Sequence, residues 1–555
     1  MWNTIIGSRL FMGVGLAAFV AGCASASSSP AARSETAGPG VEATPPPSDP
    51  APTFATIAQL QAQMEEGDLT SVELVNRCLA RIAAFDEAGP ELNAMVTVDE
   101  AGARAAAKAL DTERAKSGPR GPLHGIPVIL KDNYDTKDMP TTAGSAILAD
   151  SVPPDDATVT QRLREAGAVI LGKSHMSEFA ASYGKLGYGS VIGQTKNPYN
   201  LLRDPSGSSS GSAVAVVAGY APLATGTDTV GSVRAPSAVT GVVGIKPTMG
   251  LVSRDGIVPA SLSFDVAGPH ARTVADAAVA LRVMASQDPA DPATQVEGWK
   301  VFDVDAALAP NALSGARLGV VRTWSGANEG VDAVFENALE TLAEHGAELV
   351  EVELPDPLGN LWSVIGPVLD ADFEPEIEAY LATLSEGYPR TLEALIAAAE
   401  APELVNSEHP VNPGRIGGFR DALGAGGYDS PARKKGLEKL KEVRAMVRRL
   451  FADNDVDAFV FPTMACPASV RFDAEDPTYV CDIDDPYRPT YVASATGFPD
   501  VSVPAGLTTT DTMPVGLSFL GLPFTEARLI GLAAHFESAL AAPTQPPPTT
   551  PHLDR

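Results

Sequence analysis

The chain has 555 residues, enough for two or three average domains or for one large α/β domain. With 45% hydrophobic and 20% charged residues, it has the composition of a globular protein that can bury a sizeable core. Its 69 acidic residues outnumber its 40 basic residues, which gives a formal net charge of −29. Because such a charge repels phosphate backbones, we exclude nucleic-acid binding as a main function and expect no nucleic-acid partner.

The N-terminus predicts an export signal. Arg9 precedes an apolar stretch over 10–20, which is too short to span a bilayer and has the flanks of a cleaved signal. The stretch runs into Val-Ala-Gly-Cys, which resembles a bacterial lipobox. We therefore expect residues 1–22 to be a lipoprotein signal peptide and Cys23 to carry the lipid. A plain signal peptide whose cleavage site happens to contain a cysteine is the alternative.

A tether is predicted between the lipid and the folded part of the chain. Residues 23–53 are rich in Ser, Ala and Pro and cannot bury enough apolar surface to fold. The expected location is therefore the periplasm or cell envelope, with the membrane as a partner through the N-terminal lipid anchor.

Helical and strand-like segments alternate along the rest of the chain, which predicts one large α/β domain over 54–541 and a Pro-rich C-terminal tail over 542–555. Residues 56–116 have mostly helical periodicity. The later signals are a buried strand that ends at a lysine, a helix followed by a strand, two further strands, and a helix followed by a strand: 125–133, 163–173, 316–322, 347–355 and 433–463.

Three cysteines follow the leader. Cys78 lies on the apolar stripe of a helix that the capping-box pattern Thr70-x-x-Glu73 would start, so we expect it in the core. Cys466 and Cys481 share one loop-rich segment of a chain with an export signal, which allows a disulfide. The sequence does not give their separation in space, so the paired and the free state both stay open. The cysteines and the seven histidines show no metal-ligand spacing, and no metal or cofactor is expected.

The stretch RDPSGSSSGSAVAVVAG over 203–219 is rich in serine and glycine and admits three interpretations. A flexible linker is disfavoured because an apolar helical segment follows at once. A phosphate-binding loop is disfavoured because no lysine lies between Lys196 and Lys246. The third interpretation is a catalytic serine site.

The segment GSSSG over 207–211 fits the nucleophile elbow of α/β-hydrolases, with Ser209 as the nucleophile. That motif requires a buried strand directly before it, and here a segment with two prolines precedes it. A Ser-His-Asp triad also needs a later histidine, for which His270 is the best of a weak set. We therefore disfavour the elbow and keep it as an alternative.

A serine nucleophile can also be activated without histidine, by a lysine whose pKa burial has lowered. Lys131 suits this role because it ends the apolar strand predicted in VILKDN. On this feature alone, a structural lysine paired with Asp132 or Asp135 would be the preferred interpretation.

Several motifs together resemble those of the amidase signature family. These are KDN at 131–133, SGSSSGS at 206–212, GTDTVGSVR at 226–234 and GVVGIKPTMGLVSRDGIVP at 241–259. Further matches at 121–127, 141–145 and 514–521 extend the resemblance over nearly all of 54–540. The resemblance implies a mixed β-sheet core surrounded by helices. It also implies an enzyme that cleaves carboxamide C–N bonds through an acyl-enzyme.

The resemblance also assigns roles to individual residues. It makes Ser232 the nucleophile, Lys131 the base and Ser208 the bridging serine, which in this family follows an unusual cis peptide bond. The backbone N–H groups of Thr229, Val230, Gly231 and Ser232 would form the oxyanion hole. The supporting residues would be Ser209, Asp228 and Arg234, although a surface ion pair is the alternative for the last two.

The chain departs from the family pattern at several positions. Ser206 and Ser210 replace glycines of the serine loop, and Val230 replaces the usual glycine beside the nucleophile, so φ at residue 230 must stay negative. His175 stands where Asn is common, and we assign it no chemistry.

The serine loop, the residue at 230 and the ending PHLDR resemble bacterial peptide amidases, which remove ammonia from C-terminal peptide carboxamides and are exported. We therefore expect an exported amidohydrolase whose partner is a small-molecule or peptide amide. An amidotransferase-type subunit that acts on an acyl acceptor is the alternative. Within this family the region 285–430 varies most, and it is expected to face the substrate.

Overall fold

A computed structural model describes residues 54–540 and 547–551 of the chain. The predicted signal peptide, Cys23 and the predicted tether lie outside these residues, as does most of the predicted tail. The part of the tail that is described packs on the domain, because the Arg81 guanidinium donates to the carbonyl oxygens of Thr550 and Pro551. Within the described residues, no helix is both long and apolar enough to cross a membrane.

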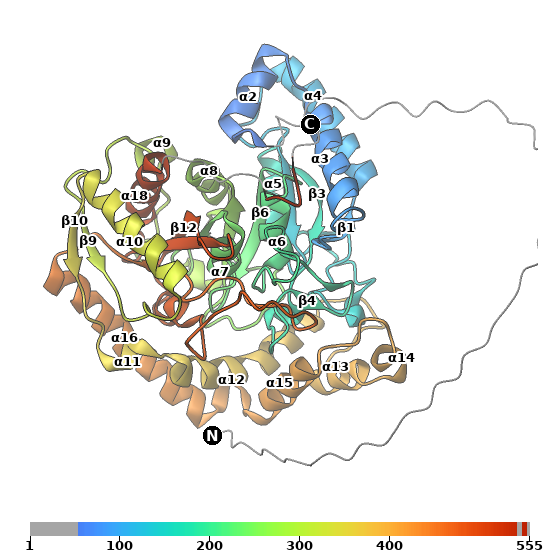
Figure 1. The fold of residues 1–555 in the computed structure, drawn as a ribbon. Helices are drawn as coiled ribbons and strands as arrows, with labels where there is room; N and C mark the ends of the chain where they lie inside the picture. Colours follow the sequence, from blue (N-terminus) through green and yellow to red (C-terminus); the bar gives the residue numbers. More distant parts are fainter. Residues whose placement is uncertain (1–53, 541–546, 552–555) are drawn as a thin grey trace, which may run out of the picture. The chain divides into compact units, whose positions relative to one another are not determined.

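The centre of the domain is an eleven-stranded mixed sheet with the order β1-β3-β2-β6-β8-β7-β12-β13-β11-β9-β10 (Figure 1). A separate two-stranded sheet pairs β4 with β5. The strands are β1 (Met95–Val98), β2 (Pro127–Lys131), β3 (Val169–Ser174), β4 (Tyr188–Gly189), β5 (Gly193–Gln194), β6 (Leu223–Asp228), β7 (Val243–Lys246), β8 (Val266–Ala271), β9 (Arg317–Val320), β10 (Glu348–Glu351), β11 (Ala458–Pro462), β12 (Asp500–Leu507) and β13 (Pro514–Leu520).

Helices surround this sheet, which confirms the predicted α/β class and the mixed-sheet core. They are α2 (Ile57–Glu66), α3 (Ser71–Phe85), α4 (Glu100–Ser117), α5 (Thr158–Glu165), α6 (Ser210–Val217), α7 (Arg234–Thr240), α8 (Val274–Met284), α9 (Val304–Ala307), α10 (Glu329–Glu344), α11 (Asp356–Gly359), α12 (Trp362–Leu381), α13 (Leu392–Ala399), α14 (Pro402–Val405), α15 (Pro413–Gly424), α16 (Pro431–Asn454), α17 (Tyr491–Thr496) and α18 (Glu526–Ala539).

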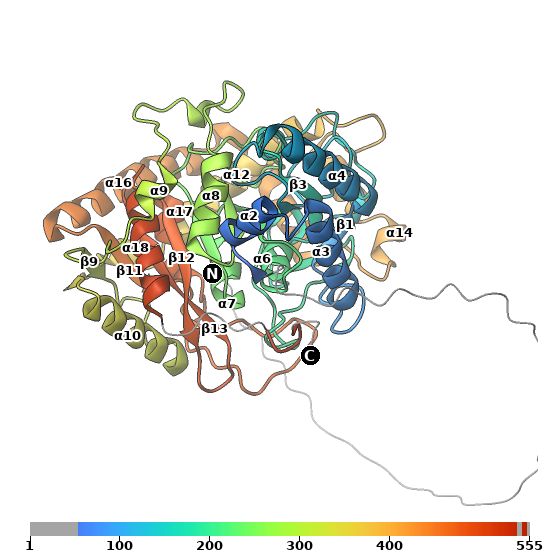
Figure 2. The same ribbon diagram turned by 90° about the horizontal axis from the view of Figure 1, so that it is seen from above.

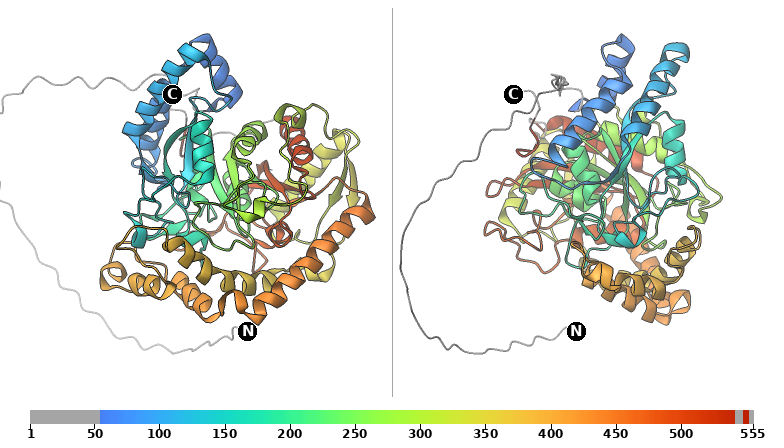
Figure 3. Two further views of the ribbon diagram at one scale, coloured as in Figure 1. Left: turned by 180° about the vertical axis from the view of Figure 1, so that it is seen from behind. Right: turned by 90° about the vertical axis from the view of Figure 1, so that its right-hand side faces the viewer.

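The central strands are covered on both faces. Every residue of β2, β3, β6, β7, β8, β11 and β13 is buried, which is the pattern of strands packed between helical layers. Helices α8 and α18 pack against each other and onto β8 and β12, as Figure 2 shows from above. Helix α12 packs against α15 and α16, and these helices form a layer along one side of the described structure (Figures 1 and 3).

The local predictions agree with the structure except at one place. The capping box at Thr70 and Glu73 starts α3, and Cys78 is a free, fully buried core residue on that helix. The expectation of mostly helical structure over 56–116 misses β1, which pairs antiparallel with β3. The strand has only four residues, Met-Val-Thr-Val, and although Val and Thr have high β propensity, they are too few to alter the periodicity of the surrounding helical windows.

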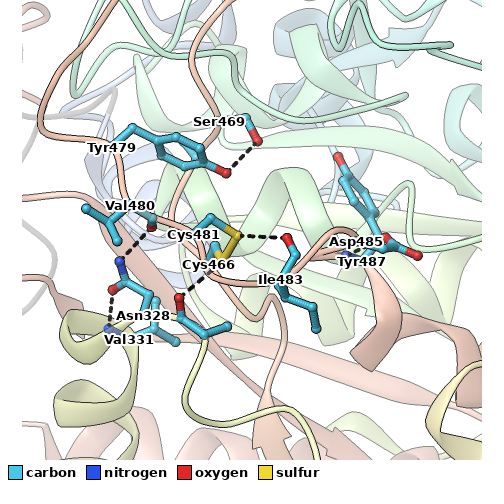
Figure 4. Close-up of a disulfide and its surroundings, with 12 residues drawn as sticks. Asn328, Val331, Cys466, Ser469, Tyr479, Val480, Cys481, Ile483, Asp485 and Tyr487 are labelled. Atoms are coloured by element: carbon cyan, nitrogen blue, oxygen red, sulfur yellow. Dashed lines mark hydrogen bonds between the residues drawn. A yellow bond between two sulfur atoms is a disulfide. The ribbon is translucent and has the colours of Figure 1, made fainter. Parts of the chain in front are cut away.

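A disulfide joins Cys466 to Cys481 and closes the loop that follows β11 (Figure 4). Asn328, which caps α10, donates through its side-chain amide to the carbonyl oxygen of Val480 at 2.9 Å, next to the bridge. The chain then continues through Ile483 to Tyr487, and both pack in the same apolar cluster as the two cysteines. The bridge therefore tethers a segment that leads directly to Tyr487.

Replacing both cysteines with serine should lower the free energy of unfolding by about 3 kcal/mol, because the bridge closes a loop of sequence separation 15. Urea denaturation of the oxidised protein and of the double variant measures the difference. A thiol reductant should destabilise the wild type and leave the double variant unchanged. Equal midpoints for all samples would contradict the expectation.

Candidate active site

Lys131 and Asp228 lie together because of the sheet topology. Strands β2 and β6 are parallel neighbours, and these residues are the last of their strands. The carboxyl ends of parallel strands meet at the same edge of a sheet, so both side chains reach the loops that follow. The backbone N–H of Lys131 also donates to Thr225 Oγ1 at 3.0 Å, which ties the end of β2 to β6.

The Lys131 ammonium is buried among hydroxyl groups. Its Nζ lies 2.9 Å from Ser208 Oγ and 2.8 Å from Thr227 Oγ1. Burial lowers the pKa of Lys131 to about 7, although the negative charges of Asp265 and Asp228 oppose this shift. A lysine in this environment is largely neutral in mildly alkaline solution and can accept a proton.

The alternative in which Lys131 pairs with a neighbouring carboxylate does not fit the structure. The carboxylate of Asp132 lies 3.4 Å from Lys173 Nζ instead. Asp135 accepts a hydrogen bond from the Tyr380 hydroxyl at 2.8 Å. Among the described residues, no carboxylate lies within ion-pair distance of Lys131.

The serine loop brings Ser208 to the lysine. The Gly207–Ser208 peptide bond is cis, and Ser208 is buried. Ser206, which replaces a glycine of the family pattern, takes φ of 62° in the left-handed region. Its carbonyl oxygen accepts a hydrogen bond from Ser210 Oγ at 2.6 Å, and its hydroxyl contacts that of Tyr487. The two serines that replace glycines, Ser206 and Ser210, are therefore hydrogen-bonded to each other within the serine loop.

Ser232 lies in the turn between β6 and α7, next to the serine loop. Its carbonyl oxygen accepts a hydrogen bond from the Ser209 N–H at 3.2 Å, which joins the two loops. No described residue forms a hydrogen bond with the Ser232 hydroxyl. The side chain lines a cavity of about 310 Å³.

Asp228 fixes the backbone of the Ser232 turn through hydrogen bonds. Its carboxylate accepts hydrogen bonds from the N–H groups of Gly231 at 2.8 Å and Val233 at 3.0 Å. Gly231 takes φ of 93°, and Val230 has no positive φ, as its β-branched side chain requires. The prediction that the Gly231 N–H is an oxyanion donor does not fit this geometry, because that group already donates to Asp228.

The other predicted oxyanion donors have no such partner. In the part of the chain that the structure describes, the backbone N–H groups of Thr229, Val230 and Ser232 make no hydrogen bond. Thr229, Val230 and Ser232 also line the cavity. These three N–H groups are therefore the ones available to a developing negative charge in this turn.

Asp228 and Arg234 form a buried ion pair, which excludes the interpretation as a surface pair. The guanidinium of Arg234 lies 3.0 Å from Asp228 Oδ1 and 2.9 Å from Asp500 Oδ2, and all three side chains are fully buried. Burial disfavours the charged form of Asp228, but the Arg234 charge and its hydrogen bonds hold the pKa of Asp228 below its usual value. The carboxylate that shapes the Ser232 turn therefore stays ionised.

The nucleophile-elbow alternative lacks its structural context. Ser209 is fully buried, and its Oγ accepts a hydrogen bond from the Thr227 N–H at 3.3 Å. A loop, not a strand, leads into it, and it does not line the cavity. His270 is also fully buried, with Nδ1 2.8 Å from Ser237 Oγ. A substrate in the cavity therefore does not reach Ser209.

His175 has a structural environment. Its Nε2 lies 2.9 Å from the carbonyl oxygen of Gly193, and burial lowers the pKa of His175 to about 4. The ring is therefore neutral near pH 7 and holds the small sheet beside the serine loop.

Six of the 18 residues that line the cavity are aromatic. The cavity opens beside Ser232 and has two charged side chains in its wall, Asp370 of α12 and Arg415 of α15. The Arg415 guanidinium lies 4.2 Å from the ring centroid of Phe419 and 4.4 Å from that of Phe373. The aromatic residues of the wall are Phe179, Tyr183, Trp362, Phe373, Tyr487 and Tyr491.

Sequence reasoning missed several residues of the site. Thr227 lies within a quoted motif, but nothing in its spacing indicates a contact with Lys131. Asp265 lies 33 residues after Ser232 and reaches the turn through Thr229 Oγ1, which donates to Asp265 Oδ1 at 2.6 Å. Arg415 falls in the region expected to face the substrate, but no local pattern singles it out.

The fold and the site define the class of the protein: an α/β enzyme with a buried lysine and two serine loops at one edge of a mixed sheet. The chain belongs to the amidase signature family, because the family model Amidase matches residues 73–530. The predicted resemblance is therefore confirmed, and the protein is an enzyme that acts on amide C–N bonds.

The similar structures include peptide amidase from Stenotrophomonas maltophilia. Its native structure has a TM-score of 0.81 and 38% identity, with 89% of this chain and 98% of that chain covered. A complex of the peptide amidase PAM with the competitive inhibitor chymostatin has a TM-score of 0.80 at the same identity, with 89% and 99% covered.

The similar proteins also include components of an amidotransferase. A glutamyl-tRNA(Gln) amidotransferase subunit from Salinispora tropica is 39% identical over 512 residues, which cover 89% of this chain and 99% of the relative. The structure of the corresponding protein from Thermotoga maritima has a TM-score of 0.67 and 29% identity, with 89% and 96% covered.

Proposed function

We propose that the protein hydrolyses carboxamides through a Ser232–Ser208–Lys131 triad and an acyl-enzyme intermediate. The observation that carries the proposal is the buried Lys131 Nζ, 2.9 Å from Ser208 Oγ, beside a cavity lined by Ser232. A base of lowered pKa, a hydroxyl relay and an accessible nucleophile are the groups that this chemistry needs.

In the proposed mechanism, Ser232 Oγ attacks the carboxamide carbon and passes its proton to Ser208, whose own proton moves to Lys131. The Ser232 hydroxyl has no hydrogen-bond partner among the described residues, so it is free to turn toward Ser208. The oxyanion accepts hydrogen bonds from the N–H groups of Thr229, Val230 and Ser232. Lys131 returns the proton through Ser208 to the leaving nitrogen, and water then releases the acid along the same path.

We propose water as the acyl acceptor, with the amidotransferase as the alternative. The sequence identities do not separate the two, since both groups of relatives are nearly 40% identical to the chain. The structural likeness favours the hydrolase, because the peptide amidase has a TM-score of 0.81 and the Thermotoga maritima amidotransferase protein 0.67. Multiple-turnover release of both ammonia and the carboxylic acid by the purified chain, without a partner protein or another acyl acceptor, tests this choice.

We propose peptides that end in a carboxamide as the substrate class. An aromatic cavity beside Ser232 suits an apolar residue next to the scissile amide, since aromatic walls bury large apolar groups favourably. A panel of peptide amides, aryl amides and short aliphatic amides, assayed for ammonia, would rank the classes. Faster turnover of short aliphatic amides would contradict the proposal.

Serine substitutions should rank in one order. Ser232→Ala should remove covalent labelling by a fluorophosphonate probe and lower turnover by at least about 10³-fold, because the nucleophile is lost. Ser208→Ala should lower turnover by about 10²–10⁴-fold, because proton transfer is impaired while the nucleophile remains. Ser209→Ala is the matched control and should keep measurable turnover. Labelling of Ser209 in an active Ser232→Ala variant would favour the nucleophile-elbow interpretation instead.

The rate of acylation should rise with pH through the pKa of Lys131, near pH 7, and stay high on the alkaline side. The sign follows from the base being active when it is neutral. Labelling reactions quenched at fixed times, from pH 5 to 9, measure this profile. The Lys131→Ala variant should lose the dependence on pH together with most of the activity. A wild-type rate that falls from pH 6 to 8 would argue against a neutral lysine base.

We propose that the protein is exported and anchored by a lipid on Cys23, on the basis of the leader sequence alone. Cys23→Ser should move the protein from the membrane fraction to a soluble or unprocessed fraction. The measurements are fractionation and the intact mass of the mature protein. A mature chain that starts at Ala24, or one that starts earlier without a lipid, would overturn the anchor.

A further inference from the structure

A carboxylate outside the triad contacts the Ser232 turn, which carries the proposed oxyanion donors and is therefore also called the oxyanion turn. Asp265, which directly precedes β8, is buried, and its Oδ1 accepts the hydrogen bond from Thr229 Oγ1 at 2.6 Å. Thr229 also lines the cavity and carries one of the three unpaired N–H groups. The orientation of this peptide unit therefore depends on a side-chain contact with Asp265 as well as on the Asp228 contacts beneath the turn.

The second oxygen of Asp265 is equally engaged. Its Oδ2 accepts hydrogen bonds from the N–H groups of Ala260 at 2.8 Å and Ser261 at 3.0 Å. Both oxygens therefore act as acceptors at once. An asparagine could accept from the 260–261 turn through its oxygen and donate to Thr229 Oγ1 through its NH2 group, so a side chain without polar atoms, as in Asp265→Ala, is needed to break both contacts.

Side chains of α12 accept hydrogen bonds from the 260–262 turn. Ser261 Oγ donates to Asp372 Oδ2 at 2.6 Å, and the Leu262 N–H donates to Glu376 Oε2 at 2.6 Å. The same helix lines the cavity with Trp362 and Phe373. A continuous set of hydrogen bonds therefore connects the cavity-lining helix to the oxyanion turn through Asp265.

We propose that Asp265 is a positioning residue for the amide reaction, because it fixes Thr229 in the oxyanion turn and ties that turn to α12. This inference rests on the proposed function. It adds a group that touches neither substrate nor nucleophile and acts through Thr229. Preorganised donors of this kind lower the barrier only when they are held where the charge develops.

Asp265 is also a titratable group near the lysine: burial raises the pKa of Asp265, and the hydrogen bonds from Thr229, Ala260 and Ser261 oppose this shift and favour the carboxylate. The charged or titratable groups around Lys131 are Asp228 at the end of β6, Asp265, and His270 of β8. His270 is neutral near pH 7, since burial lowers its pKa to about 3. Both carboxylates raise the pKa of Lys131, so neutralising Asp265 should move the acidic limb of the rate profile to lower pH.

The test uses the full-length protein and the rate of labelling by a fluorophosphonate probe. Thr229→Val removes the hydroxyl and keeps the shape, so labelling should slow by about 10–100-fold, whereas Thr229→Ser should stay within about threefold of wild type. Asp265→Ala, which removes both acceptor oxygens, should slow labelling at least as much as Thr229→Val. The double variant should be no slower than the worse single variant, because both changes break one contact.

The pH profile separates positioning from a general loss of structure. The acidic limb should move to lower pH in Asp265→Ala, which removes the carboxylate, and stay in place in Thr229→Val, which keeps it. Wild-type labelling rates in both variants, with Ser232→Ala unlabelled, would overturn this inference and leave the proposed function intact. Wild-type labelling of Ser232→Ala would overturn the proposed function itself. If Asp265→Ala does not fold, the Thr229→Val and Thr229→Ser pair decides alone, and equal rates in those two variants would overturn the inference.

Discussion

The site depends on one buried lysine that has hydroxyl partners and no ion-pair partner within the described residues. Lys131 contacts Ser208 and Thr227, whose oxygens bind an ammonium and a neutral amine alike. A carboxylate in direct contact would keep the lysine protonated, and a fully apolar environment would leave the proton without a path. Lys173, another buried lysine at this edge of the sheet, shows the contrast, because it pairs with Asp132.

The surrounding structure keeps negative charge near Lys131 but out of contact. The Asp228 carboxylate accepts hydrogen bonds from Arg234 and from the backbone of the Ser232 turn. The Asp265 carboxylate accepts them from Thr229 and from the 260–262 turn. Each carboxylate therefore orders a loop and at the same time adjusts the pKa of the lysine from a distance. This double use explains why these two buried acids lie beside the oxyanion turn.

The cavity wall comes from parts of the chain that are distant in sequence. Phe179 follows β3, Trp362 and Phe373 belong to α12, and Tyr487 lies after the disulfide loop. Tyr487 contacts Ser206 in the serine loop, so the tethered segment reaches the loop that carries Ser208. The cavity wall and the strand ends that carry Lys131 and Asp228 therefore come from separate parts of the chain.

The sequence by itself determined the α/β class, the family and the residues at the two strand ends, because the motifs are contiguous and their side chains lie in local turns. The absence of a strand before GSSSG argued against Ser209, and the family resemblance assigned the role of nucleophile to Ser232. Only the tertiary structure decided which partner Lys131 takes, that the Gly231 N–H is already bound to Asp228, and that Asp265 and Arg415 reach the site. These contacts join segments far apart in the chain, and the register of the sheet and the packing of α12 and α15 set their distances, which no local pattern encodes.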